Sequence, residues 1–141
     1  MYYSWYNITS SNGNNSFQVI WPIGAKTSTF SITIPNGFYS ITDLNSYLQQ
    51  YYITNGLYLI NSSGQYLYYA EFLTNSNYYS VQFNAYSVPT SLPAGWTQPS
   101  NFVGYPSSIH HTANCTIKEF SKYYWQKCRH ISFYSTNHNL F

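Results

Sequence analysis

The chain has 141 residues and a net charge of +2, and 22% of its residues are aromatic while only 6% are charged. This length suits one domain with a real core. The sequence contains no apolar run of the roughly 18 residues that cross a membrane, and its start lacks the basic and apolar regions of a signal peptide. We therefore expect no membrane partner, and a location in a virion or inside a cell.

Charged and titratable residues are distributed unevenly along the chain. Residues 1–109 carry a net charge of −1, with Lys26 as the single cation and Asp43 and Glu71 as the only carboxylates. A nucleic-acid reader needs a basic stripe, so we exclude nucleic acid as a partner of this part. Acid–base and nucleophilic catalysis need titratable groups placed together. The sequence thus predicts no enzyme and no cofactor.

The first predicted elements are two strands. Apolar and polar residues alternate in FQVIW (17–21) and again in TFSITI (29–34), with β-favourable residues throughout. Pro35, Asn36 and Gly37 follow as a turn, because Pro presets φ and Asn-Gly tolerates a positive φ.

The period then changes to that of a helix over about residues 42–52. Its apolar positions fall at helical spacing: Ile41, Leu44, Tyr47, Leu48 and Tyr51. Thr42 before Asp43 is the expected N-cap, with an acid in the first turn. Asn55-Gly56 supplies the expected C-terminal stop.

Further strands are predicted after the helix. Residues 57–61 and 66–73 read as a hairpin around Ser62-Ser63-Gly64, residues 79–85 alternate as another strand, and the Pro/Gly-punctuated loop 88–108 carries only a short strand near Phe102. We predict a mainly β fold, a sandwich or single-jelly-roll-like sheet pair with one helix against its side. Disorder is the alternative for so Tyr/Asn/Ser-rich a chain, but the periodic apolar residues favour a folded domain.

Two stretches of the chain resemble a known family. NGFYSITDLNSYLQQYYITNGLYLINSSGQYLYYAEF (36–72), followed by VPTSLPAGW (88–96), resembles Tyr/Asn-rich β-proteins associated with Polinton/Maverick-type integrated viral elements and aquatic DNA viruses. The family pattern is P-x-G-x-Y-x-I-x-D-L/I-N-x-Y-L-Q, a hairpin and P-x-S-L-P-x-G, and the similarity covers about residues 4–106. The resemblance implies a single-jelly-roll minor capsid, penton or spike component without catalytic residues.

The chain departs from this family after the Pro-rich loop. Family members continue with T-P-Q-I and F-x-x-I-I-G-x-N-x-G-T-Y-P, whereas residues 107–141 of this chain contain neither Gly nor Pro. When the codons are read one base out of frame, those of Trp125-Gln126 must encode Gly, and the Tyr123–Tyr124 junction encodes Ile or Thr. In the same way, the codons of residues 111–115 permit Thr-Pro-Gln-Ile. We therefore interpret residues 110–141 as a frameshifted or unselected tail, partly disordered or weakly helical. The C-terminal strands would then be missing from an incomplete domain 1–109, leaving a sheet edge unpaired.

The tail also contains zinc-ligand residue types, namely His110, His111, Cys115, Cys128 and His130. Structural zinc sites usually show close cysteine pairs, but twelve residues separate Cys115 from Cys128. We predict neither a metal site nor, without a secretory signal, a disulfide.

The strongest binding signal is the richness in Tyr and Trp, which give large, rigid, amphipathic contact area. As exposed binding residues we predict Trp5, Tyr6, Tyr68, Tyr69, Tyr79 and Trp96. The first hypothesis is a non-enzymatic structural protein that self-assembles or binds other virion proteins through these side chains. The alternative is a carbohydrate-binding adhesin or lectin-like β-sandwich, in which exposed rings stack on glycans.

Overall fold

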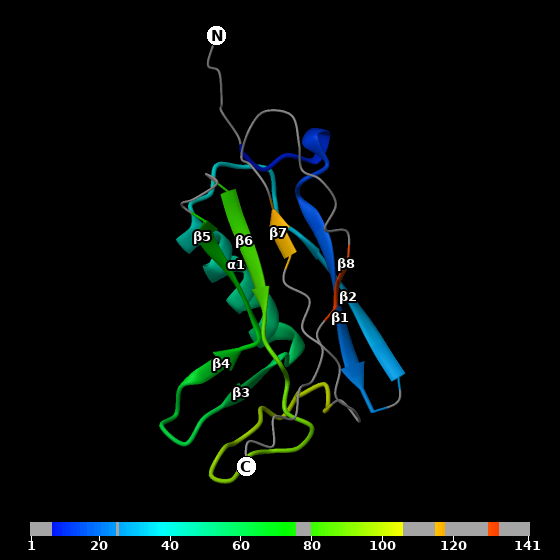
Figure 1. Ribbon diagram of the computed structural model, residues 1–141, viewed down its shortest axis with the longest axis vertical. Helices are drawn as coiled ribbons and strands as arrows, with labels where there is room; N and C mark the ends of the chain where they lie inside the picture. Colours follow the sequence, from blue (N-terminus) through cyan, green and yellow to red (C-terminus); the bar gives the residue numbers. More distant parts are fainter. Residues whose placement is uncertain (1–6, 25, 76–79, 106–114, 118–129, 133–141) are drawn as a thin grey trace.

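A computed structural model describes residues 7–24, 26–75, 80–105, 115–117 and 130–132 of the chain. The fold is mainly β with one α-helix, as predicted (Figure 1). In chain order the elements are η1 (Ser10–Asn12), β1 (Ser16–Ile23), β2 (Lys26–Thr33), α1 (Ile41–Asn55), β3 (Tyr58–Ile60), β4 (Tyr66–Tyr68), β5 (Ala70–Asn75), β6 (Ser80–Ala85), β7 (Cys115–Ile117) and β8 (His130–Ser132).

The first sheet is built on the antiparallel hairpin β1–β2, whose register pairs Val19 with Phe30 and Trp21 with Ser28. Successive side chains of a strand point to opposite faces, so one face of this sheet collects Val19, Trp21 and Ile32. All three are fully buried. The alternation read from the sequence is therefore confirmed for both strands.

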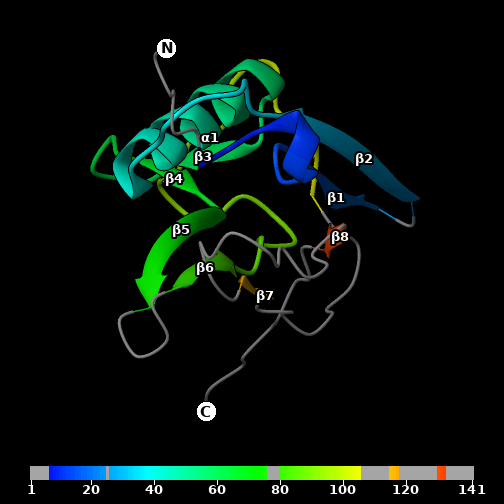
Figure 2. The same ribbon diagram turned by 90° about the horizontal axis from the view of Figure 1, so that it is seen from above.

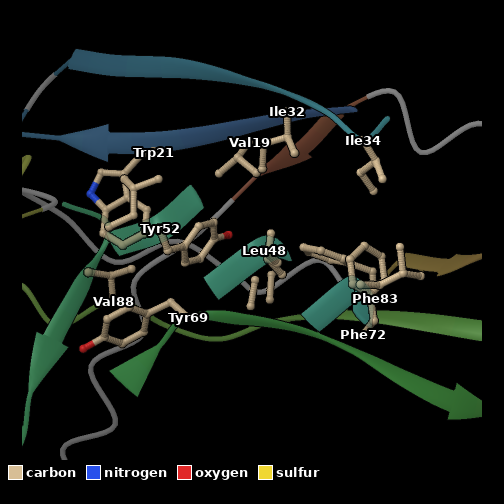
Figure 3. Close-up of a cluster of buried hydrophobic side chains, with 14 of the residues drawn as sticks. Val19, Trp21, Ile32, Ile34, Leu48, Tyr52, Tyr69, Phe72, Phe83 and Val88 are labelled. Carbon is tan, nitrogen blue, oxygen red and sulfur yellow. The ribbon is translucent and has the colours of Figure 1, made fainter. Parts of the chain in front are cut away.

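A second sheet, with strand order β5-β6-β7, faces the first across a shared core. Figure 3 shows Phe72 and Phe83 of this sheet opposite Ile34, and Leu48 of α1 opposite Val19 and Ile32. Phe72 and Phe83 meet edge to face at 4.9 Å between ring centroids. The arrangement is compatible with the predicted sheet pair, but the sandwich or jelly-roll architecture stays a prediction.

The third sheet is the two-stranded hairpin β3–β4, in which Tyr58 pairs with Tyr68 and Ile60 with Tyr66. The hairpin was predicted, but its second strand does not run on to residue 73. The chain bends at Tyr69, so that β4 belongs to the hairpin and β5 to the second sheet. Tyr69 and Ala70 are both buried. The bend breaks the two-residue period, because Ala70 and Phe72 are buried although they share the parity of the exposed Tyr66.

Helix α1 begins one residue earlier and ends three residues later than predicted. Its N-cap is Ser40, not Thr42: the Ser40 hydroxyl accepts from the Asp43 amide, and the Asp43 carboxylate accepts from the Ser40 amide. This reciprocal pair is a capping box, which needs an acid or amide three residues after the cap and not one residue after it. The predicted stop at Gly56 is confirmed by its φ of 67°.

Helix α1 covers the outer edge of β2 with two tyrosine hydroxyls. The Tyr47 hydroxyl donates to the Thr33 carbonyl at 2.6 Å, and the Tyr51 hydroxyl donates to the Ser31 carbonyl at 3.0 Å. Because β2 is the edge strand of its sheet, these carbonyls have no neighbouring strand on that side. The helix supplies the missing donors.

The same helix covers the outer edge of β5 with an amide. Asn45 donates to the Phe72 carbonyl at 2.8 Å and accepts from the Phe72 amide at 2.7 Å, so its side chain imitates a paired strand residue. Between the two edges, the buried face of the helix (Leu44, Leu48 and Tyr52) enters the core. In Figure 2, α1 lies along one side of the molecule beside both sheets.

On the side away from α1, short strands from the tail pair with both sheets (Figure 2). Strand β7 pairs with Val81–Phe83 of β6, and β8 pairs in parallel with Gln18–Ile20 of β1. The tail was expected to be partly disordered or weakly helical; its described residues lie in these two strands, and residues 118–129 lie outside the described part. The open backbone groups of β1 and β6 favour strand pairing over a weak helix.

The loop after β6 carries no strand near Phe102, which corrects that prediction. An isolated bridge pairs Thr97 with Ile60 of β3 instead, and Phe102 packs against the core. No helix in the described ranges combines the length and apolarity of a membrane span.

We predict that Asn45→Ala lowers the free energy of unfolding by about 1–3 kcal/mol, because it removes both partners of the partly buried Phe72 backbone groups. The matched control is Gln49→Ala on the exposed face of the same helix, which we expect to stay within about 0.5 kcal/mol. Urea denaturation measures both. Equal effects of the two substitutions would show that Asn45 does not protect the β5 edge.

A second prediction concerns pH. Hydrogen bonds from the Ser40 side chain and backbone lower the pKa of Asp43 below its ordinary 3.8. A lowered folded-state pKa stabilises the fold above the unfolded-state pKa, and this stabilisation is lost as pH falls through the folded value. The stability difference between the wild type and Asp43→Asn should therefore be largest near roughly pH 6 and shrink towards roughly pH 2.5. Urea titrations of both proteins at these two pH values check it; a pH-independent difference would contradict it.

Candidate binding surface

One face of the β3–β4 hairpin carries a tyrosine row, formed by Tyr58, Tyr66 and Tyr68. The ring centroids of Tyr58 and Tyr66 lie 5.0 Å apart, and those of Tyr58 and Tyr68 lie 6.1 Å apart, both pairs tilted. Tyr58 lies between the other two and is only 8% exposed, whereas Tyr66 is 49% exposed. The hairpin therefore presents a continuous aromatic surface whose central ring is covered by its neighbours.

The sequence builds this row through strand alternation. Residues 66 and 68 point to the same face of β4, and the register places Tyr58 directly opposite Tyr68. Leu59 and Leu67 pair on the other face, and Leu59 is fully buried in the core. Leu59 thus holds the hairpin against the body, while on the tyrosine side Tyr68 packs partly against the core and Tyr66 is exposed.

The turn that joins the strands is fixed by an asparagine. The Asn61 side-chain oxygen accepts from the backbone amides of Ser63 and Gln65, and its amide nitrogen donates to the Gln65 side chain. Gly64 supplies the positive φ of 78° that the turn requires. This turn keeps the row in one geometry. In Figure 1 the hairpin lies at the lower end of the molecule.

The row is uncharged at neutral pH. Partial burial raises the pKa of Tyr68, and the nearby phenols of Tyr58 and Tyr66 raise it further. A phenol with a raised pKa remains protonated and can both donate and accept hydrogen bonds. The surface therefore offers rings and neutral hydroxyls, which suits contact with another amphipathic surface.

The predicted binding residues lie in different environments. Tyr68 belongs to the tyrosine row, and Trp96 is partly buried against the core in the loop that reaches β3 through the Thr97–Ile60 bridge. Three of the predicted residues lie outside the described part of the chain: Trp5, Tyr6 and Tyr79.

The prediction that Tyr69 is exposed is wrong. Its side chain is only 7% exposed and meets Trp21 edge to face, with ring centroids 5.9 Å apart. Figure 3 shows the ring inside the core beside Val88. The physical reason is alternation itself: Tyr69 follows Leu67 on the side of the strand where Leu59 is buried, so its ring enters the core. Burial, with Tyr105 nearby, raises the pKa of its hydroxyl strongly.

Sequence reasoning missed three exposed or row-forming aromatics. Tyr58 and Tyr66 complete the row; the signal for them was the two-residue spacing in YLY (66–68) together with the hairpin register. Phe38 is 75% exposed in the loop between β2 and α1. Its signal was a large apolar residue directly after the predicted Asn-Gly turn.

The described residues hold one contact between a carboxylate and a phenol on the outer face of the second sheet. The Tyr86 hydroxyl donates to the Glu71 carboxylate, and this hydrogen bond is the main cause that raises the pKa of Tyr86. A raised pKa keeps the phenol protonated and makes it a poorer base. The contact therefore fixes a side chain and does not activate a nucleophile.

Within the ranges that the structure describes, no three His, Cys, Asp or Glu side chains lie close enough to share a metal ion. The side chains of His110, His111, Cys115, Cys128 and His130 lie outside those ranges. Comparison with protein-family models, with curated proteins and with solved structures finds no match for this chain.

We predict that Tyr69→Phe leaves the free energy of unfolding unchanged or raises it by up to about 1 kcal/mol. The buried Tyr69 hydroxyl has no hydrogen-bond partner among the described residues, and removing an unpaired buried polar group is not costly. Tyr69→Ala, by contrast, should cost about 3–5 kcal/mol through the cavity it leaves. Denaturant titration of both variants checks this; a clear loss in Tyr69→Phe would show that the hydroxyl makes a stabilising bond.

Proposed function

We propose that this protein is a non-enzymatic structural component that self-assembles through the tyrosine row. The observation that carries the proposal is the row itself: three tyrosine rings in contact on one face of a hairpin, with Tyr66 exposed, which Leu59 and an ordered turn hold in place. Tyrosine is enriched at interfaces because its ring buries apolar area while its hydroxyl still finds a partner. A fixed row needs little ordering on binding, which favours affinity.

Charge supports contact with a neutral partner. Residues 7–105 contain only Lys26, Asp43 and Glu71 as charged side chains, and none of them belongs to the hairpin. Two copies of this surface meet with little electrostatic repulsion and without long-range attraction. Burial of aromatic area is then the main driving force, and assembly should depend weakly on salt.

We further propose that the assembly is of a virion kind, with the chain as a minor-capsid- or spike-like component or the genomic remnant of one. The support is the resemblance described above, whose motif segment 36–72 contains α1, the whole β3–β4 hairpin and the tyrosine row. Mainly β sheet pairs with one helix suit such components. The single-jelly-roll connectivity belongs to this proposal.

A carbohydrate-binding module is the second candidate, and one observation favours it. The exposed Tyr66 ring stands next to the turn that carries the amides of Asn61 and Gln65. Sugar rings stack their C–H faces on aromatic rings, and amides bond to sugar hydroxyls. In this chain, however, Asn61 uses its side chain to hold the turn, which leaves fewer groups for a ligand. We therefore place self-assembly first.

The test is the oligomeric state of the double variant Tyr66→Ser/Tyr68→Ser, measured by sedimentation velocity across a concentration series. We expect the wild type to form concentration-dependent oligomers and the double variant to be monomeric, because two of the three rings are lost. Tyr86→Ser is the matched control, since Tyr86 is 42% exposed but lies outside the row.

The same proteins are applied to a glycan array to separate the two candidates. Oligomers that the double variant loses, without glycan signal, support self-assembly. A monomeric wild type whose glycan signal disappears in the double variant would overturn self-assembly and establish the second candidate.

A further inference from the structure

Phe38 is the most exposed large hydrophobic side chain of the described residues. It is 75% exposed, against 49% for Tyr66 and 41% for Leu92. A single exposed apolar residue is ordinary on protein surfaces. Phe38 differs because the backbone on both sides of it is held by specific contacts.

Those contacts come from the segment before β1. Ile8 and Gly37 exchange two backbone hydrogen bonds, of 3.1 and 2.9 Å. The Asn7 side chain donates to the Tyr39 carbonyl at 2.8 Å and accepts from the Tyr39 amide at 2.9 Å. Phe38 is thus the one residue between two clamped neighbours. Its exposure belongs to a defined conformation of the loop.

Gly37 makes this conformation possible. A Cβ atom at position 37 would lie 2.9 Å from the Tyr39 ring, closer than side chains tolerate. Tyr39 packs against the core from this position, while Phe38 points to solvent. The loop therefore directs one aromatic ring inward and the next one outward.

Phe38 and the tyrosine row lie at opposite ends of the molecule. Figure 1 shows the loop between β2 and α1 at the upper end and the β3–β4 hairpin at the lower end of the longest axis. Two complementary patches at opposite ends of one chain make a heterologous contact, which links copies head to tail. An isologous dimer would need the same patch on both partners.

The chemistry of both ends indicates a second copy as the partner. Seven uncharged polar residues flank the two patches: Ser10, Asn36, Ser40, Asn61, Ser62, Ser63 and Gln65. The one charge bonded to this set is the Asp43 carboxylate, which accepts from Ser40, so a strongly charged partner would find little that is complementary. A projecting ring and a row of tilted rings fit each other, since aromatic side chains prefer edge-to-face contact and interface anchors tend to pair.

We propose that Phe38 of one copy packs on the tyrosine row of the next, so that the protein assembles head to tail. This inference rests on the proposed function and adds the partner surface and the symmetry. Phe38 is the anchor of the contact, and Tyr58, Tyr66 and Tyr68 are its receptor. Repetition of the contact gives an open chain of copies, or a ring where the rotation closes.

The test is complementation between two variants. Phe38→Ser retains the row but lacks the anchor, and Tyr66→Ser/Tyr68→Ser retains the anchor but lacks the row. We expect each variant alone to be monomeric at concentrations where the wild type forms a series of oligomers. A 1:1 mixture should form heterodimers and nothing larger, because only one intact contact can form. Sedimentation velocity and light scattering measure the masses, and Leu92→Ser serves as the control for a generic exposed apolar residue.

The alternative outcomes are distinct. Oligomers that persist in Phe38→Ser but disappear in the tyrosine variant would overturn the head-to-tail contact and leave the proposed function standing. A mixture that stays monomeric would also overturn the head-to-tail contact, since near-ultraviolet circular dichroism verifies that both variants are folded. A wild type that is monomeric throughout the series would overturn the proposed function itself.

Discussion

The structure depends on helix α1 lying against the edges of two different sheets. On one side Tyr47 and Tyr51 hydrogen-bond to carbonyls of β2, and on the other Asn45 satisfies both backbone groups of Phe72 in β5. Between these contacts the buried face of the helix fills the core. An open sheet edge is a site of aggregation, and burying it without partners is costly. Helix α1 covers the edges of both sheets, provides hydrogen-bond partners for their backbone groups and sets the distance between the sheets.

The use of a side-chain amide to bond to backbone groups also explains why a chain with so few charged residues can contain so many asparagines. Neutral asparagine side chains lie at positions where other proteins have charged helix caps or further strands. Asn7 pairs with the backbone of Tyr39, Asn61 holds the hairpin turn, and Asn101 donates to the carbonyls of Ile53 and Thr54 at the end of α1. An amide carries a donor and an acceptor at once, so it replaces a strand residue without adding charge. Residues 7–105 therefore carry only three charged side chains.

Local pattern predicted the elements well where a single periodicity governs a segment. The hairpin β1–β2, the strand β6 and the stop at Gly56 follow from alternation and turn chemistry. The errors occur where a tertiary contact outweighs the local pattern. Tyr69 packs on Trp21 inside the core, and Ile117 joins the open edge of β6. The candidate surface was half predicted, since Tyr68 was named from its sequence while Tyr58 and Tyr66 gain their role only from the hairpin register.

The sequence by itself determined a mainly β domain with one helix, low charge and a surplus of tyrosine, because these follow from composition and from side-chain periods along the chain. Only the tertiary structure decided which tyrosines are buried and which gather in the row, because that depends on strand pairing. It also decided that Phe38 stands exposed, because hydrogen bonds from residues thirty positions away in sequence hold its loop. Contacts between distant segments are not encoded in any local period, and they set which aromatic side chains the described residues leave exposed.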